Sequence, residues 1–106
     1  MIKEILTAAA IPHQPAQFPD PPSQTYAVYF DSTTSDGPDV GPGLTITHDC
    51  MVELYAPSIS DGDASLNGLR SELNARSIRC TTQGWYWLSS IQRYQEIVEF
   101  TYIKKT

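Results

Sequence analysis

Hydrophobic and polar residues alternate along the middle of the chain, from Leu44 to Tyr55. Leucine, isoleucine, histidine, cysteine and valine occupy the even positions of this segment, and threonine, aspartate, methionine, glutamate and tyrosine occupy the odd ones. Side chains of a β-strand point alternately to its two faces. The pattern therefore predicts a long strand over residues 44–55 with one largely apolar face.

A second strand is predicted over residues 26–30, which read Tyr-Ala-Val-Tyr-Phe. Both of its faces are apolar, which is typical of a strand inside a sheet. Residues 32–43 are rich in serine, threonine, glycine, proline and aspartate and predict a loop that is long for a small domain. Five prolines between positions 12 and 22 predict an extended segment over 12–25.

Two segments show the 3.6-residue spacing of an amphipathic helix. The first is residues 1–11, with Ile2, Ile5, Leu6 and Ala9 on one face and Pro12 as its end. The second carries Leu66, Leu69 and Leu73 on one face and is predicted to run from Ser60 to about Arg76. Ser60 is its expected N-cap, with Asp63 as the acidic partner. Gly68 interrupts this helix and indicates close packing against the sheet.

The last third of the chain concentrates its aromatic residues in two short segments, 85–88 and 93–102. Their aromatic and β-branched content, with a few polar residues between them, predicts a β-hairpin. The element order is therefore helix, two strands, helix, two strands. We expect a single α+β domain over residues 1–106, with a mostly antiparallel four-stranded sheet and both helices on one face.

The charge balance excludes one class of partner. The chain has 12 acidic and 7 basic residues, a formal net charge of −5. Neutralising phosphates requires clustered Lys and Arg, so sequence-independent nucleic-acid binding is not expected, and we predict no sequence-specific nucleic-acid partner. The apolar run of residues 5–11 is far shorter than the roughly 20 residues that cross a bilayer, so we expect a soluble protein without a membrane partner. Cys50 and Cys80 are expected to be thiols in a reducing cytoplasm.

Candidate chemistry is sparse. His48 and Cys50 lie side by side on one face of the predicted strand and are the one pair suited to nucleophilic catalysis, but they belong to a core stripe and are better explained as structural. Neither HxH nor CxxC spacing is present, and Asp61-Gly62-Asp63 lacks the glutamate that closes a calcium loop. Glu96 and Glu99 should face opposite sides of a strand. We therefore predict no catalytic, cofactor or metal site, and a protein that is not an enzyme.

Large aromatic side chains on both faces of the hairpin exceed what one small core requires. They could form the core alone, a stacking platform for a ligand, or a core together with an interface. The surplus of apolar area favours an interface with other subunits. Its candidate residues come from the hairpin and from the long loop: Asp36, Gly37, Asp39, Val40, Trp85, Trp87, Tyr94 and Tyr102.

Several segments together resemble small tail-component proteins of phages and prophages. They are Pro-Asp-Pro-Pro at 19–22, Tyr-Ala-Val-Tyr-Phe-Asp at 26–31, Asp-Gly-Pro-Asp at 36–39, Thr-His-Asp-Cys-Met-Val-Glu-Leu-Tyr at 47–55, the capped helix at 60–77, Tyr-Trp-Leu at 86–88 and Arg-Tyr-Gln at 93–95. The resemblance covers almost the whole chain and is to the tail-completion, or tail-terminator, group of long-tailed phages.

This resemblance implies an α+β subunit that forms a homo-oligomeric ring, typically a hexamer, where the tail tube meets the head connector. Its partners would be other copies of itself, the tube protein and the head–tail connector protein. The chain would be made in the host cytoplasm and located in the virion. The acidic balance agrees with a lumen through which DNA passes. The alternative from another class is a small acidic monomer that binds and masks a basic partner.

Overall fold

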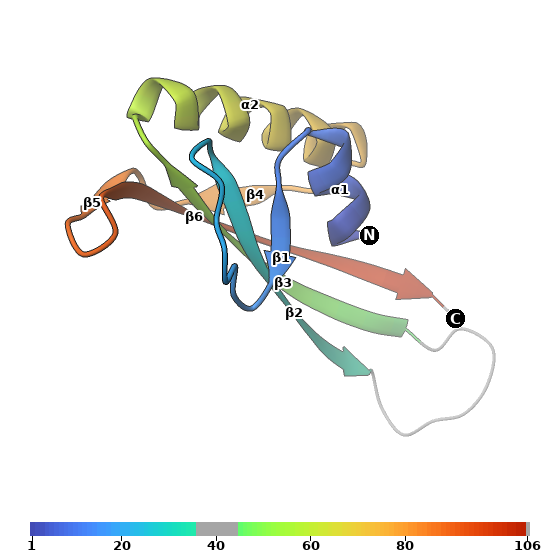
Figure 1. Ribbon diagram of the computed structural model, residues 1–106. Helices are drawn as coiled ribbons and strands as arrows, with labels where there is room; N and C mark the ends of the chain where they lie inside the picture. The colour runs from blue at the N-terminus through green and yellow to red at the C-terminus, as the bar shows by residue number, and fades with distance from the viewer. Residues whose placement is uncertain (36–44, 106) are drawn as a thin grey trace.

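The computed structural model describes residues 1–35 and 45–105. These residues form two helices and a mixed sheet of six strands, in the order α1 (Ile2–Ala8), β1 (His13–Pro15), β2 (Tyr26–Ser35), β3 (Thr45–Ala56), α2 (Ile59–Ala75), β4 (Cys80–Thr82), β5 (Tyr86–Leu88) and β6 (Arg93–Lys105). The predicted α+β class and the layering of both helices on one face are confirmed (Figure 1).

The sheet has the order β1-β2-β3-β6-β4, and β5 pairs with β6 beside β4. Its centre is antiparallel, with Tyr26 opposite Tyr55 and Val52 opposite Val98. The predicted count of four strands was wrong, because β1 and β4 each add three residues at an edge. β1 runs parallel to β2 and contains Pro15, a residue that edge strands tolerate because they need no donor on their outer side.

The predicted alternation in the long strand is confirmed over the described residues 45–56. Cys50, Val52, Leu54 and Ala56 are buried, while Met51, Glu53 and Tyr55 on the other face are half-buried. Leu69 and Leu73 from α2 and Ile5 and Leu6 from α1 are fully buried in the same core. These side chains come from both helices and the sheet, so one hydrophobic layer holds the domain together.

The loop predicted over 32–43 begins later than expected. β2 continues to Ser35, with Thr33 opposite His48 and Thr34 opposite Thr47. Threonine suits a strand when a partner strand is available, and β3 supplies that partner, which sequence composition could not show. Residues 36–43 of the predicted loop lie outside the described residues.

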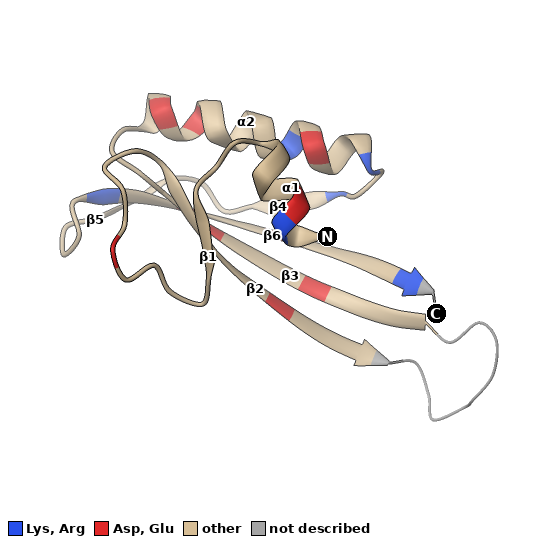
Figure 2. Ribbon diagram, turned by 45° about the vertical axis from the view of Figure 1, so that its right-hand side comes forward, with Lys and Arg blue, Asp and Glu red and all other residues tan. Residues whose placement is uncertain are grey.

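Three strands extend beyond the helices. Figure 1 shows β2, β3 and β6 continuing together past the region that the helices cover. We call this three-stranded extension the arm and define it as residues 31–35, 45–49 and 101–105. The other end of the molecule carries the start of α2 and the β5–β6 turn, so the arm and the aromatic hairpin lie at opposite ends (Figures 1 and 2).

Candidate functional site

The pair considered for catalysis, His48 and Cys50, lies on the helix side of β3 at the base of the arm. His48 Nδ1 donates to Asp31 Oδ1 over 2.9 Å, and its ring stacks on Tyr102 with centroids 4.4 Å apart. Cys50 is buried, and burial together with the Asp31 carboxylate raises the pKa of its thiol to about 12. At neutral pH Cys50 is therefore protonated, the opposite of an activated nucleophile.

Metal ligands do not converge in the part of the chain that the structure describes. Within residues 1–35 and 45–105, no group of three His, Cys, Asp or Glu side chains could hold an ion. His13 instead shares a hydrogen bond of 2.8 Å with the carbonyl of Ile11. No helix among the described residues is long and apolar enough to cross a membrane.

Trp85, a predicted interface residue, packs against the start of α2 within the subunit. Its indole Nε1 donates to Asp63 Oδ1 over 2.7 Å, and its ring lies directly over Gly62 in the first turn of α2. The ring is half-buried and packs against the hydrophobic core. Trp85 thus attaches the start of α2 to the segment before β5, a role that its position in an aromatic cluster did not reveal.

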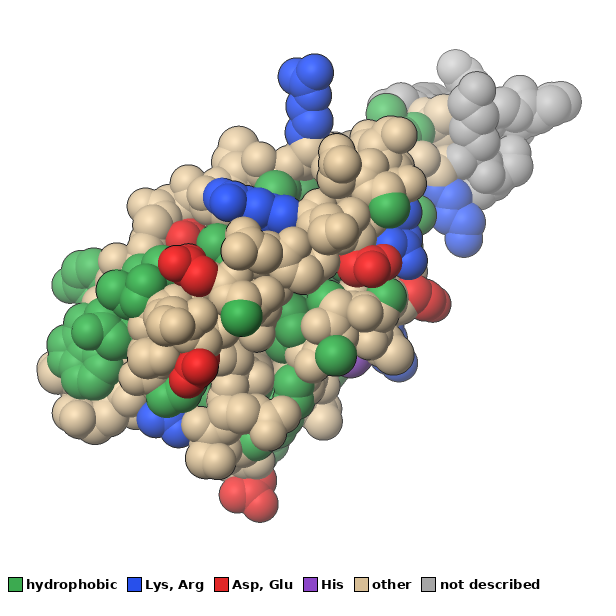
Figure 3. Space-filling model, turned by 90° about the horizontal axis from the view of Figure 1, so that it is seen from above, with side chains coloured by type: hydrophobic (Ala, Val, Ile, Leu, Met, Phe, Trp, Pro, Cys, Tyr) green, Lys and Arg blue, Asp and Glu red, His purple; other side chains and the backbone are tan. Residues whose placement is uncertain are grey.

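Trp87 and Tyr94 lie at the surface beside one another. Trp87 is 43% exposed, and its ring centroid is 4.8 Å from that of Tyr94. Tyr86 and Ile91 add further exposed apolar surface to the same hairpin. Figure 3 shows hydrophobic side chains gathered at the end of the molecule away from the arm. We call Tyr86, Trp87, Ile91 and Tyr94 the aromatic tip.

Tyr102, the last hairpin residue in the predicted interface, belongs to the arm and is half-buried under its stack with His48. The structure therefore does not bring the predicted residues into one patch. Trp87 and Tyr94 lie at one end of the molecule and Tyr102 toward the other. Asp36, Gly37, Asp39 and Val40 lie outside the described residues.

Glu96 is a buried carboxylate whose structural role the sequence did not reveal. It is 2% exposed, whereas Glu99 faces solvent, so the predicted divergence of the two is confirmed. Its oxygens accept backbone N–H groups from Gln83 (2.8 Å), Gly84 (3.0 Å) and Ile97 (2.9 Å). The carboxylate thus satisfies the backbone in the gap between β4 and β5, where β6 has β3 on one side and no described strand on its outer side.

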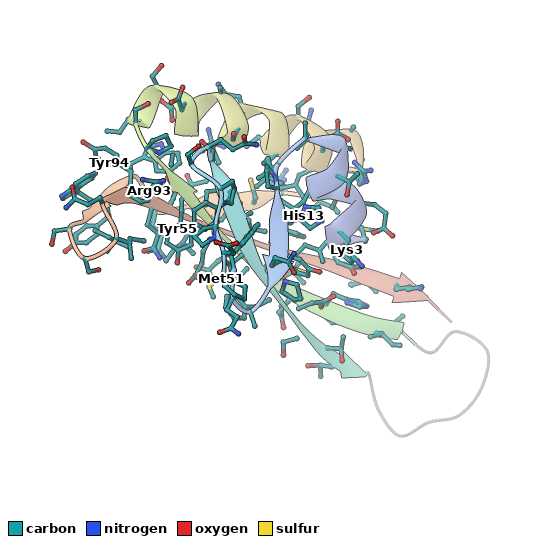
Figure 4. The ribbon with its side chains drawn as sticks, in the orientation of Figure 1. Lys3, His13, Met51, Tyr55, Arg93 and Tyr94 are labelled. Atoms are coloured by element: carbon teal, nitrogen blue, oxygen red, sulfur yellow. The ribbon has the colours of Figure 1, made fainter. Side chains whose placement is uncertain are left out.

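The sheet face away from the helices is only partly covered. Figure 4 labels Met51, Tyr55 and Arg93 along this face. The Pro-rich segment after β1 crosses part of it, where Phe18 packs edge-on against Tyr26 and Tyr26 stacks on Tyr55. The Tyr55 hydroxyl donates to Glu53 and accepts from Gln95, each over 3.0 Å, and burial raises its pKa to about 12. Phe30, nearer the arm, remains 38% exposed.

The arm has strand edges along which the structure describes no partner strand. β1 pairs with β2 only along Ala27–Tyr29, and β4 pairs with β6 only along Val98–Phe100. Beyond those points, β2 and β6 each have an outer side that no other described strand covers. Such edges offer backbone N–H and C=O groups to another polypeptide. The arm and the aromatic tip are therefore the two surfaces suited to binding protein.

Comparison of the chain with models of known protein families and with curated proteins finds no match.

Proposed function

We propose that this chain is a structural subunit of a phage tail, of the tail-completion or head–tail joining kind. In this proposal copies of the chain close a ring, with six members as the expected number, at the head-proximal end of the tail tube. The ring contacts the tube protein on one side and the head–tail connector protein on the other. The finished protein belongs to the virion and is made in the host cytoplasm.

One observation carries the proposal: the arm has uncovered strand edges on both of its sides. A subunit with an edge on each side can contact one neighbour through the first and another neighbour through the second. Contacts of that kind generate rings when the rotation between neighbours closes. A subunit with only one uncovered edge could pair with a single neighbour through its arm and could not form a ring in this way.

The aromatic tip gives the subunit a second type of contact surface, away from the arm. Aromatic residues are enriched at the centres of protein interfaces, and Tyr86 and Trp87 are the exposed aromatics of this end. A joining protein needs surfaces for unlike partners as well as for its own copies. The arm and the tip, at opposite ends of the molecule, are suited to those two tasks (Figure 1).

Net charge and sequence resemblance support the same function. The formal charge of −5 suits a passage along which DNA slides without binding. The segments that resemble tail-completion proteins include β2, β3 and α2, which build the core and the base of the arm.

Light scattering coupled to size exclusion tests the proposal. We expect a closed oligomer of the purified chain, either alone or after addition of the tail-tube protein. A strict monomer under both conditions would contradict the proposal. If that monomer instead bound a basic protein, the alternative function as a small acidic masking protein would be supported. Electron microscopy of tails with a labelled chain should place it at the head-proximal end.

A further inference from the structure

The two outer edges of the arm have similar lengths and begin at the same height along the strands of the sheet. On one side β2 is uncovered over 31–35, and on the other side β6 is uncovered over 101–105. Cys50 of β3 lies opposite Asp31 on one side and Phe100 on the other, so both edges start at the same level of the sheet. Each edge is long enough to pair with the other edge of a second copy.

The hydrogen bonds of neighbouring residues establish which backbone groups face outward. Ala27 N–H donates to Pro12 O and Tyr29 O accepts from Ala16 N–H, so odd-numbered residues of β2 point away from β3. In an antiparallel strand the N–H and C=O of one residue point to the same side. Asp31 and Thr33 therefore present free backbone groups at the β2 edge.

The same argument applies to β6. Ile97 N–H points away from β3, since it donates to the Glu96 carboxylate in the gap between β4 and β5. Thr101 and Ile103 are an even number of positions from Ile97 along the strand, so their backbone groups point to the same side as those of Ile97. Their N–H and C=O groups face outward at the β6 edge, because the alternation continues along the ladder.

We propose that a second copy of this chain covers each edge, with the outer edge of β6 in one copy pairing with the outer edge of β2 in the next. The two strands run in the same direction within a subunit, since both are antiparallel to β3. Parallel pairing between copies keeps both helix layers on the same face of the joined sheet. Antiparallel pairing of β6 with β2 would put the two helix layers on opposite faces, which repetition around a ring does not allow.

Charge favours pairing of unlike edges over pairing of like edges. Asp31 is the charged residue of β2 beyond β1, and Lys104 is on the uncovered end of β6. Joining two β2 edges brings no cation to Asp31, and joining two β6 edges brings no carboxylate to Lys104, whereas joining unlike edges brings these two opposite charges to the same face. Like charges opposite one another destabilise a strand pair, whereas opposite charges stabilise it.

One register satisfies both charge and apolar contact. In a parallel pair, a residue whose backbone N–H and C=O bond across to the partner strand lies opposite a residue whose backbone groups bond back to its own sheet. The side chains of these two residues lie on the same face of the joined sheet. Lys104 can therefore lie opposite Thr33 and beside Asp31 on the helix side, in a register that pairs only uncovered residues of the two strands. The same register puts Ile103 opposite Ser32 and beside Phe30 on the other face, where Ile103 and Phe30 are 65% and 38% exposed in the single subunit. Pairing would cover both.

This inference rests on the proposed function, because it names the contact by which the copies assemble. Pairing of unlike edges leaves each end of an oligomer with one uncovered edge until the ring closes. It also predicts that the contact between copies is mainly backbone hydrogen bonding at the arm, with the aromatic tip left for another partner.

Disulfide crosslinking tests the register. In a Cys80→Ser background, Ser32→Cys combined with Ile103→Cys should form a ladder of covalent oligomers on mild oxidation, because each copy carries both halves of the contact. Opposite residues of paired strands have Cα separations that a disulfide can bridge, roughly 5 Å. Either single variant should stay at least tenfold below the ladder yield. A single variant that forms covalent dimers as efficiently would show pairing of like edges and would overturn the proposal.

A second pair of variants tests the edge without oxidation. Thr33→Pro removes an outward-facing N–H and should reduce the scattering mass to that of a monomer, while the circular dichroism and unfolding midpoint stay close to wild type. Thr33→Ala keeps the N–H and should assemble normally. Assembly that survives Thr33→Pro would refute the pairing, as would loss of tube binding alone, which would show that the tube protein covers this edge.

The two proposals can fail separately. If wild-type protein is a monomer alone and with tube protein, the assembly function fails. If wild type forms a ring but the Ser32→Cys, Ile103→Cys chain gives no ladder, the function stands and the edge pairing is wrong.

Discussion

At the level of single residues, contact between Trp85 and Gly62 determines how closely α2 approaches the segment before β5. The indole lies against the backbone of the first turn of the helix, and its N–H is held by Asp63. A Cβ at position 62 would overlap two ring carbons of Trp85 and would lie 3.0 Å from the Cβ of Ala56. Gly62 is therefore required by packing rather than by backbone conformation.

Gly62→Ala should lower the free energy of unfolding by about 1–2 kcal/mol, because the overpacking cost exceeds the gain in helix propensity. Gly68→Ala is the matched control. Its added Cβ would meet only Ala9, at 3.8 Å or more, so stability should rise by up to about 1 kcal/mol. Urea unfolding of both variants measures the difference. Equal stability of the two variants would refute this packing role.

Glu96 is the second residue whose local contacts should have a large effect on the stability of the domain. Glu96→Gln keeps the size of the side chain, but its amide group cannot accept all three N–H donors. We expect a loss of about 2–3 kcal/mol in the free energy of unfolding, the range for hydrogen bonds to a buried charged group. Glu99→Gln, on the exposed side of the same strand, should change stability by less than about 0.5 kcal/mol. A similar loss in both variants would mean that carboxylate charge alone matters.

At the level of elements, α2 begins earlier than its sequence suggested. Ser58, not Ser60, is the N-cap: its Oγ accepts from the N–H of Asp61 over 3.1 Å. Both serines are followed three residues later by an aspartate, so the pattern alone could not choose between them. The chain leaves β3 at Ala56 and reaches the helix layer after Pro57, which places Ser58 at the first turn.

Ser58→Ala should therefore cost about 1 kcal/mol of stability, the usual effect of removing an N-cap oxygen. Ser60→Ala should have little effect, because Ser60 is an exposed residue inside the first turn. The midpoints of urea unfolding compare the two variants directly. A larger loss of stability for Ser60→Ala than for Ser58→Ala would show that Ser60 is the N-cap, as predicted from the sequence.

At the level of the whole molecule, the subunit combines a packed body with an arm that has few neighbours. Both helices cover the body, and β1 and β4 stop before the arm begins (Figure 1). Segments with few buried contacts and exposed backbone groups open most easily. In a single subunit, the amides of the arm should therefore be the least protected from hydrogen exchange in the sheet. Their protection should increase most on assembly.

Hydrogen exchange tests this arrangement residue by residue. In the monomer, the outward-facing amides of Thr33, Thr101 and Ile103 should exchange rapidly, whereas those of Thr34 and Tyr102, which face β3, should be protected. Assembly should slow the outward-facing amides at least tenfold. Protection that instead appears only around Trp87 would show that the aromatic tip, not the arm, joins the copies.

Periodicity in the sequence predicted most of the body. The alternation of β3, the leucine spacing of α2 and the composition of the aromatic hairpin each identified an element, because apolar residues recur at the period of the structure that buries them. The short strands β1 and β4 were missed. Three residues are too few to show a period, and both strands exist only because β2 and β6 offer an edge beside them.

The candidate surfaces were harder to predict. Sequence composition showed a surplus of aromatic residues, and Trp87 is indeed exposed, but Trp85 has the same composition signal and is half-buried against α2, where it donates to Asp63. Nothing in the sequence separates the two tryptophans, since their environment depends on how α2 folds back over the hairpin. The uncovered edges of the arm leave no trace in composition at all.

The sequence by itself therefore determined the class of fold, the faces of its main elements and the acidic charge, all of which depend on residues close together in the chain. Tertiary structure alone decided which edges remain uncovered, which tryptophan is exposed and where Glu96 finds its donors. Those features join residues far apart in sequence, such as Asp63 with Trp85 and Gln83 with Glu96, and no local pattern records such contacts.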